Sequence, residues 1–465
     1  MDFLSTLFVL STGLLILVLI FLFLHDKFQS TNAIQRNYPV LARLRPISTT
    51  LGEFFRRYIS DSDREGQPFS RDTREWVQEA AAGKKDIRSF GTELFYRDRE
   101  FYFKSAVFPI NTDEAEPVTH PIIGPLSEHP YTPQSLFNMS AMSFGSLSAP
   151  AIEALSLGTA LAKCWMNTGE GGLSQYHLQG NGDIVFEIGT AKYGIRDVAG
   201  ILDEDKLKNI AANPQIKMFE LKLSQGAKPG KGGVLPGSKV TQEISKIRNI
   251  PKGKDSISPN RHAEASTIEE LLDFINYLKL TTTKPVGFKT AVGNIHWFDE
   301  LCTAMKQRDT QSLPDFITID GSEGGTGASP MMLMDRVAMS IRQALPQVNE
   351  VLDSAGLKDR IRIIASGKLV TAGEVAWALA SGADYVVSAR GFMFSIGCIQ
   401  AMRCHTDSCP SGVATHDPDL QRALIPSAKK IKVAQYVKNI QEEVEVIAHS
   451  CGLKQSRGLK THHLG

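Results

Sequence analysis

The 465-residue chain is predicted to fold as an α/β protein, a (β/α)8 TIM barrel that follows one transmembrane helix and a small adaptor region. Three observations support this prediction. Strand-like and helix-like segments alternate from about residue 130 onward, several of the strand-like segments are apolar throughout, and an uncharged apolar run opens the chain. Alternation of this kind is typical of parallel sheets whose strands are joined by helices.

Eight short segments have the composition of buried strands: Leu136–Met142, Cys164–Thr168, Asp183–Ile188, Met218–Ser224, Pro285–Thr290, Phe316–Asp320, Ile361–Ser366 and Tyr385–Ala389. Continuous apolar runs are expected where a parallel strand is covered on both faces. Helical patterns lie between them at Ala149–Lys163, Thr267–Leu280, His296–Gln307, Arg336–Ala355 and Thr371–Ala380. Eight alternating strands favour a closed barrel. An open doubly wound sheet is the alternative.

The first apolar run, Phe3 to Leu24, carries no charge and is long enough to cross a bilayer, which takes about 20 residues. A cleaved signal peptide would place positive charge before the run and a small-residue site after it. Only Met1 and Asp2 precede this run, and His25–Lys27 follows, so an uncleaved anchor is favoured. Basic residues come next, which predicts a single-pass cell-membrane protein with its large C-terminal part in the cytoplasm. These residues are Lys27, Arg36, Arg43, Arg45, Arg56 and Arg57.

The predicted organisation has four parts: a transmembrane helix at 3–24, an adaptor or linker at 25–114, the barrel at 115–450 and a tail at 451–465. The formal net charge is +1, from 51 basic and 50 acidic residues, so no nucleic-acid partner is expected. Hydrophobic residues make up 42% of the chain, which is enough for a large core.

Three of the six cysteines, Cys398, Cys404 and Cys409, lie within the segment 398–409. Disulfides are rare in cytoplasmic proteins, so this spacing indicates metal chemistry. Thiolates are soft ligands that suit iron–sulfur clusters, and three of them fit a cluster with three ligated irons. Zinc bound by the same cysteines and His405 is one alternative. Unconnected core cysteines are another.

Glycine-rich and polar motifs follow the ends of most predicted strands, where barrels place their active sites. Glycine lets the backbone approach a ligand closely, and successive backbone N–H groups can hold a phosphate. Several such motifs at one barrel end favour a phosphorylated cofactor over simple tight turns. Lys289 ends the fifth strand and could neutralise charge on a reduced flavin ring. A solvated surface lysine is the alternative.

Five ordered motifs resemble the FMN-binding synthase domain of glutamate synthases: Met142–Ser146, Asn167–Gly172, Gln225–Gly230, Gly324–Ser329 and Cys398–Asp417. The resemblance covers roughly residues 115–450. It implies a TIM barrel that carries FMN and a 3Fe–4S cluster. It also implies reduction of 2-iminoglutarate, made from 2-oxoglutarate and ammonia, to L-glutamate, with electrons passing from the cluster to the flavin.

The same resemblance assigns residues to roles. Cys398, Cys404 and Cys409 resemble the cluster ligands, and the cofactor-binding residues are Ser143, Asn167, Lys289, Gly324, Gly325, Gly367 and Gly391. The substrate-site residues are Glu170, Gln225, Lys228 and Arg248, with Glu170 and Lys228 as the catalytic pair. Lys228 or Arg248 would bind a substrate carboxylate. Glu170 would donate a proton or orient the substrate amine, unless it only caps backbone N–H groups of its glycine loop.

The chain also departs from the family pattern. Lys231 and Val234 replace a Glu and a Gln of the family's substrate segment, and Glu323 stands in an altered glycine segment. The chain begins Met1-Asp2, without the family's N-terminal amidotransferase cysteine, so ammonia is expected from elsewhere. A ferredoxin or an NAD(P)H-dependent reductase is the expected electron donor.

These departures leave other functions open. One is a membrane-tethered flavin and iron–sulfur redox relay or sensor without synthase turnover. Another is an FMN barrel acting on hydroxy acids or isoprenoid phosphates, which the three clustered cysteines disfavour.

Overall fold

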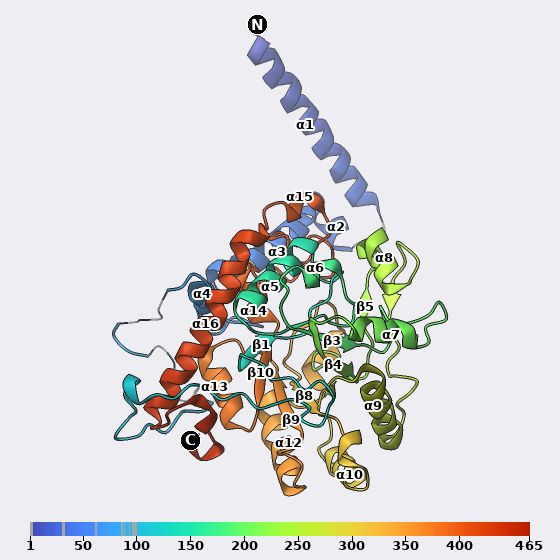
Figure 1. Cartoon of the computed structure of the whole chain (residues 1–465). Helices are drawn as coiled ribbons and strands as arrows, with labels where there is room; N and C mark the ends of the chain where they lie inside the picture. The colour runs from blue at the N-terminus through green and yellow to red at the C-terminus, as the bar shows by residue number, and fades with distance from the viewer. Residues whose placement is uncertain are drawn as a thin grey trace. The chain divides into compact units, whose positions relative to one another are not determined.

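The computed structural model describes residues 3–29, 33–60, 63–84, 87, 89–92, 94 and 100–465. Its centre is a closed barrel of eight parallel strands in the order β1-β10-β9-β8-β7-β4-β3-β2 (Figure 1). The strands are β1 Phe137–Met139, β2 Met166–Asn167, β3 Ile184–Ile188, β4 Ile216–Lys222, β7 Val286–Thr290, β8 Phe316–Asp320, β9 Arg362–Ser366 and β10 Tyr385–Ser388. Each lies within or beside one of the eight predicted segments. The barrel prediction is therefore confirmed, and the alternative prediction of an open doubly wound sheet is wrong.

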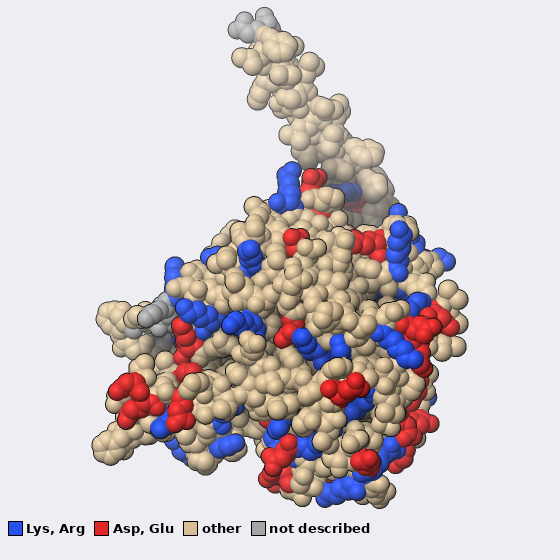
Figure 2. Space-filling model, viewed as in Figure 1, with Lys and Arg blue, Asp and Glu red and all other residues tan. Residues whose placement is uncertain are grey.

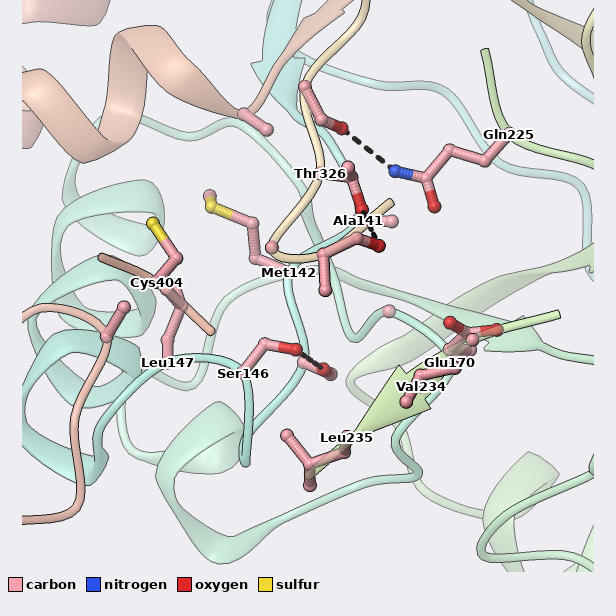
Figure 3. A pocket seen from close by; sticks show the side chains of 18 of the residues that line it. Ala141, Met142, Ser146, Leu147, Glu170, Gln225, Val234, Leu235, Thr326 and Cys404 are labelled. Atoms are coloured by element: carbon pink, nitrogen blue, oxygen red, sulfur yellow. Dashed lines mark hydrogen bonds between the residues drawn. The ribbon is translucent and has the colours of Figure 1, made fainter. Parts of the chain in front are cut away.

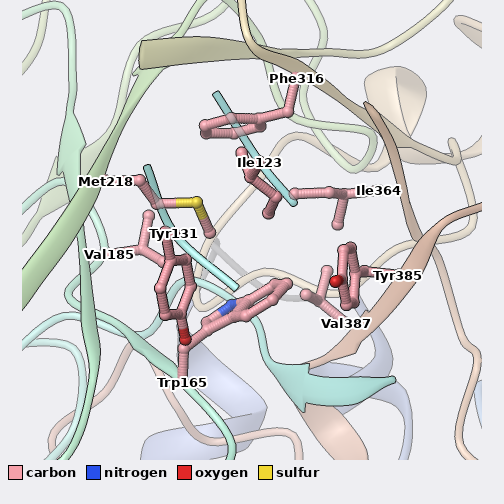
Figure 4. Close-up of a cluster of buried hydrophobic side chains, with 9 residues drawn as sticks. All are labelled: Ile123, Tyr131, Trp165, Val185, Met218, Phe316, Ile364, Tyr385 and Val387. Atoms are coloured by element: carbon pink, nitrogen blue, oxygen red, sulfur yellow. The ribbon is translucent and has the colours of Figure 1, made fainter. Parts of the chain in front are cut away.

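A cluster of buried side chains fills one end of the barrel (Figure 4). Trp165 lies between two tyrosines of this cluster, with ring centroids 6.3 Å from Tyr131 and 5.4 Å from Tyr385. Tyr131 and Ile123 come from the segment before β1, where their backbones form an antiparallel bridge. This segment covers the barrel at the starts of the strands, and the opposite end is the one where barrels place their active sites.

Helices alternate with the strands and surround the barrel (Figure 1). Of the helices that begin after residue 70, those longer than six residues are α4 Arg71–Ala81, α5 Ala149–Leu161, α7 Glu204–Ala211, α8 Gln242–Arg248, α9 Ile268–Thr282, α10 His296–Lys306, α12 Ile341–Ser354, α13 Ala372–Ala380 and α16 Pro426–Ser450. The shorter ones are α6 Gln175–Leu178, α11 Met331–Arg336, α14 Arg390–Ser395 and α15 Pro418–Gln421. The five predicted helices correspond to α5, α9, α10, α12 and α13.

Capping explains where several helices begin. Thr267 accepts a hydrogen bond from the Glu270 N–H, and the Glu270 carboxylate accepts one from the Thr267 N–H, so α9 begins with a capping box. The predicted helix at 336–355 begins later than expected, because Ser340 caps α12 at Ile341, and a separate short helix, α11, ends at Arg336.

The long segment 225–265 is folded into a small substructure. β5 Val234–Leu235 and β6 Ser256–Ile257 form an antiparallel pair, and α8 lies between them. This substructure carries Arg248 at the last position of α8. It therefore places residues far from any barrel strand at the mouth of the barrel.

The chain divides into two compact units, 1–74 and 75–465. The N-terminal unit contains α1 Phe3–Phe28, α2 Ala33–Asn37, a 3-10 turn Leu41–Arg43, α3 Leu44–Phe55 and a π-helical turn Arg56–Ser60. α1 is long and apolar enough to cross a membrane by length and composition. Charged side chains are absent from most of its visible surface (Figure 2). The predicted domain boundaries at 24 and 114 remain predictions.

Candidate active site

A pocket opens at the C-terminal ends of the barrel strands, with about 1010 Å³ of space between its lining atoms, including the open mouth. Predicted site residues meet in it although they lie far apart in the sequence. Its lining includes Ser143, Glu170, Gln225, Lys228, Arg248, Lys289, Gly325 and Cys404. Glu170 and Val234 stand on one side of the pocket, with Cys404 across from them (Figure 3). The barrel thus brings the predicted substrate, flavin and cluster segments to one cavity.

Glu170 forms the centre of a charged cluster on one wall. Its carboxylate lies 3.3 Å from Lys222 Nζ and 3.7 Å from Lys228 Nζ. Burial alone would raise the pKa of Glu170, but Lys222, Lys228 and Arg248 together lower that pKa to about 2. Glu170 is therefore ionised at neutral pH, which suits an acceptor of hydrogen bonds and does not suit a proton donor.

Arg248 is 4% exposed and reaches the pocket from α8. Its guanidinium donates hydrogen bonds to Ser256 Oγ (3.1 Å) and to the Phe144 carbonyl (3.3 Å), and lies over the Tyr193 ring. Its Nε is buried without a hydrogen-bond partner among the residues that the structure describes. Such an orphaned donor is expected to find its partner in a bound ligand.

Gln225 is held in place by both of its amide atoms. Its oxygen accepts a hydrogen bond from Lys222 Nζ (3.0 Å), and its Nε2 donates to the Gly325 carbonyl (2.8 Å; Figure 3). Gln225 therefore joins the charged wall to the glycine segment that follows β8.

Strand register creates a second charged group beneath the first. β3 pairs Glu187 with Glu220 on β4, and β4 pairs Lys222 with Lys289 on β7. Lys289 Nζ donates to Glu187 Oε2 at 3.3 Å. Burial opposes charge on Lys289, but Glu187, Asp320 and Glu220 raise its pKa above the ordinary value. Lys289 is therefore a buried cation in the pocket, and the predicted alternative of a solvated surface lysine is wrong.

Glu220 lies deeper in the barrel and accepts hydrogen bonds from Asn167 Nδ2 (2.9 Å) and Thr318 Oγ1 (2.5 Å). Burial raises the pKa of Glu220 to about 7, Lys289 opposes that rise, and Glu187 adds to it. The Asn167 Oδ1 atom also accepts the Gly169 N–H at 2.9 Å. Asn167 therefore supports the glycine loop that carries Glu170, and it does not line the pocket itself.

The predicted flavin residues divide into two groups. Ser143, Lys289 and Gly325 line the pocket, whereas Gly324, Gly367 and Gly391 are not among its lining residues. A Cβ at Gly391 would meet Tyr436 Oη at 2.1 Å. Packing against α16 therefore accounts for a glycine at this position.

The three predicted cluster ligands are free thiols. Cys398 and Cys409 are buried, and Cys404 is partly exposed. Burial raises the pKa of Cys398, Arg390 opposes this rise, and Cys404 and Cys409 add to it. Among the described residues, no three or more His, Cys, Asp or Glu side chains lie in a group that could hold a metal ion.

Two cations beside these cysteines were not assigned a role from the sequence. Lys239, 1% exposed, donates to the carbonyls of Ser146 (2.8 Å), Ala414 (3.1 Å) and Cys404 (3.2 Å). Arg390 donates to the Thr326 carbonyl (2.5 Å) and approaches Cys404 Sγ at 3.9 Å. Lysines are rarely buried, so nothing in the composition of this segment could have marked Lys239.

Residues 96–454 match a family model described as the conserved region in glutamate synthase. The Bacillus subtilis protein named glutamate synthase large subunit-like protein YerD is 40% identical over 490 residues, which span 97% of this chain and 92% of that protein.

Other relatives share only part of their length. The archaeal glutamate synthase (NADPH) of Methanocaldococcus jannaschii is 35% identical over 323 residues, 69% of this chain and 59% of that protein. The glutamate synthase (NADPH) large chain of Bacillus subtilis is 32% identical over 330 residues, 68% of this chain and 20% of that protein. The chain thus spans less than two thirds of the length of each of these two relatives.

Proposed function

Because the chain belongs to the glutamate synthase family, which confirms the resemblance and makes it an oxidoreductase acting on CH–NH2 donors, we propose a reductive amination. In this reaction a 2-oxo acid and ammonia form an imine, which the protein reduces to the amino acid. The proposed substrate is 2-oxoglutarate and the product L-glutamate, with FMN and a 3Fe–4S cluster as cofactors. Each turnover takes two electrons and two protons.

The observation that carries this proposal is the charge balance of the pocket wall. Three cations, Lys222, Lys228 and Arg248, surround the Glu170 carboxylate, and Glu187 adds a second carboxylate 3.9 Å from Lys222. The excess positive charge and the orphaned Nε of Arg248 favour an anionic substrate with a carboxylate that can bind bidentately. We assign Lys228 and Arg248 to the substrate carboxylates.

Glu170 is assigned to the substrate nitrogen. Since its pKa is lowered to about 2, the carboxylate is an acceptor at neutral pH and orients an N–H group of the imine or the product ammonium. Gln225 positions this wall against the glycine segment after β8.

Ser143, Lys289 and Gly325 are assigned to FMN, because they line the pocket beside the proposed substrate wall. Bound FMN supplies hydride to the imine carbon. Lys289 is suited to stabilising negative charge on a reduced ring, since it is buried and held as a cation by Glu187. The assignments of Gly324, Gly367 and Gly391 depend on the resemblance alone.

Cys398, Cys404 and Cys409 are assigned to the cluster. Free thiols supply the soft donors that an iron–sulfur centre needs, and Arg390 and Lys239, which contact Cys404, would offset its negative charge. Cys404 lines the pocket, which supports electron transfer from this segment to the flavin site. Electrons would come from a ferredoxin or an NAD(P)H-dependent reductase.

The test is anaerobic reoxidation of the reduced, purified protein by a panel of 2-oxo acids, with and without ammonium. We expect 2-oxoglutarate with ammonium to oxidise the flavin faster than buffer and to yield L-glutamate, whereas glutamine alone should not. If no oxo acid accelerates reoxidation, the synthase proposal is wrong.

A redox relay or sensor is the second candidate function. Val234 favours it, because this apolar side chain faces the pocket where the family pattern has a Gln. A relay would keep flavin and cluster but show no acceleration by any oxo acid in the same assay.

We further propose that α1 anchors the protein in the cell membrane with residues 75–465 in the cytoplasm. The length and apolar composition of α1 support an anchor, and the basic residues that follow it support this orientation. A cleaved signal sequence is the alternative for this helix. Protease protection in intact cells tests the orientation.

A further inference from the structure

An apolar stripe runs along α3 in the N-terminal unit. Its members recur every three or four residues, so they share one face of the helix. Leu44, Ile47, Leu51 and Phe55 are 54%, 57%, 51% and 54% exposed. A helix of a soluble protein normally buries such a face, and contiguous apolar patches of this kind mark interaction surfaces.

An ion pair joins the end of α1 to the segment just before α3. Asp26, in the last turn of α1, is fully buried, and its carboxylate accepts hydrogen bonds from Arg43 at 2.6, 2.9 and 3.1 Å. The Val40 N–H donates to the same carboxylate at 3.0 Å. Arg43 directly precedes α3, so the stripe begins where α1 ends.

The sequence around α3 is strongly basic. Residues 27–60 contain a single acidic residue, Glu53, and six basic ones: Lys27, Arg36, Arg43, Arg45, Arg56 and Arg57. Side chains of this charge are attracted to anionic lipid headgroups, and an apolar face with basic flanks is typical of helices that lie in the plane of a membrane surface.

We propose that α3 is a membrane-surface helix, which inserts its Leu44–Phe55 stripe among the acyl chains beside anionic headgroups. The inference depends on the proposed anchoring by α1. Continuity with the anchor favours a bilayer over a second protein as the occupant, because the Asp26–Arg43 pair keeps α3 next to the end of the membrane-spanning helix.

The test uses the full-length protein in phosphatidylglycerol–phosphatidylcholine vesicles with brominated acyl chains, which quench tryptophan in the bilayer. Leu51→Trp reports the stripe. Thr49→Trp is the matched control, because Thr49 and Leu51 are two positions apart, which places them roughly 200° apart around the helix and so on opposite faces. The native tryptophans contribute equally to both variants, and Ile47→Trp serves as a second reporter if Leu51→Trp does not fold.

We expect bromolipid quenching of Leu51→Trp to exceed that of Thr49→Trp by about twofold or more, and to weaken when phosphatidylglycerol is omitted. Equal quenching of the two variants would overturn the inference. So would a blue-shifted Leu51→Trp signal that bromolipids do not quench, because the stripe would then be covered by protein.

Vesicle flotation separates this inference from the anchor. If the protein floats with vesicles but Leu51→Trp is not quenched, the surface helix is wrong and the anchor stands. If the protein does not float, the proposed anchor fails and the surface helix fails with it.

Discussion

Gly233 lies so close to Glu170 that a Cβ on the glycine would stand 2.1 Å from Glu170 Oε1. The β5 segment therefore presses its bare backbone against the carboxylate that Lys222 and Lys228 also hold. This contact makes the position of Glu170 depend on a residue without a side chain.

Gly233→Ala should displace Glu170 and lower turnover, because the added methyl group cannot occupy that space. Overpacking of this kind costs about 1–3 kcal/mol, so we expect a loss of turnover by roughly tenfold or more with a modest loss of stability. Gly293→Ala is the control, since this glycine is exposed and a Cβ added to it would meet nothing within 4 Å. Equal activity in both variants would contradict a role for the Gly233 contact.

Glu220 should make the stability of the protein depend on pH. Burial raises its pKa to about 7 from the ordinary 4.5, so the folded protein retains a proton that the unfolded chain releases. The contribution of the retained Glu220 proton to the free energy of unfolding is complete below pH 4.5 and is lost as pH rises through about 7. Glu220→Gln stays neutral and should lack this loss.

The measurement is the difference in melting temperature between wild type and Glu220→Gln across pH 5 to 8. As pH rises, the melting temperature of the wild type should fall relative to that of the variant, by about 2–4 °C for each kcal/mol of unfolding free energy lost. A difference that does not change with pH would mean that Glu220 keeps the same charge throughout.

Cys404→Ser should remove the cluster. We expect iron and acid-labile sulfide in the wild-type protein, and an EPR signal near g = ~2 in the oxidised state. The variant should lose most of its iron and the signal. Cys302→Ser, a buried cysteine on α10, is the control and should retain both. Stoichiometric zinc without iron would favour the predicted alternative in which His405 completes a zinc site.

Lys228→Ala should nearly abolish turnover while the flavin stays bound. Removing one partner of a buried charge pair costs about 2–5 kcal/mol, a decrease of roughly 30-fold or more in kcat/KM. Lys231→Ala, an exposed lysine in the same segment, should change little. Flavin loss from Lys228→Ala would show that this lysine serves the cofactor site.

Val234→Gln should strengthen binding of 2-oxoglutarate. A side chain that hydrogen-bonds the substrate, such as the new Gln, favours that substrate over analogues that cannot make the bond, by up to ~10⁴-fold in strong cases. We expect a lower KM for 2-oxoglutarate, and no comparable change in Val234→Leu. An unchanged KM would mean that the natural substrate makes no polar contact at this position.

Local patterns predicted much of the barrel. The eight apolar runs lie at the eight strands, because a parallel strand buried on both faces must be apolar whatever its neighbours are. T-x-x-E patterns begin α9 and α13 through contacts within one turn. α16 was not predicted, although Val433, Val437, Ile440 and Val444 follow helical spacing and are all buried.

The candidate site was predicted in part. Glu170, Lys228 and Arg248 were assigned by resemblance, and the structure brings them to one pocket. The pairing of Glu187 with Lys289 was missed, because it depends on the register between strands that are separated by about a hundred residues.

By itself the sequence determined the order of strands and helices, the apolar N-terminal segment and the spacing of the three cysteines, since each depends on residues close together in the chain. Only the tertiary structure decided that Lys239 and Arg390 lie beside Cys404, and that Gly233 meets Glu170. The physical reason is barrel closure. Closure brings the C-terminal ends of all eight strands to one rim, so charges from distant segments share one buried site and shift one another's protonation.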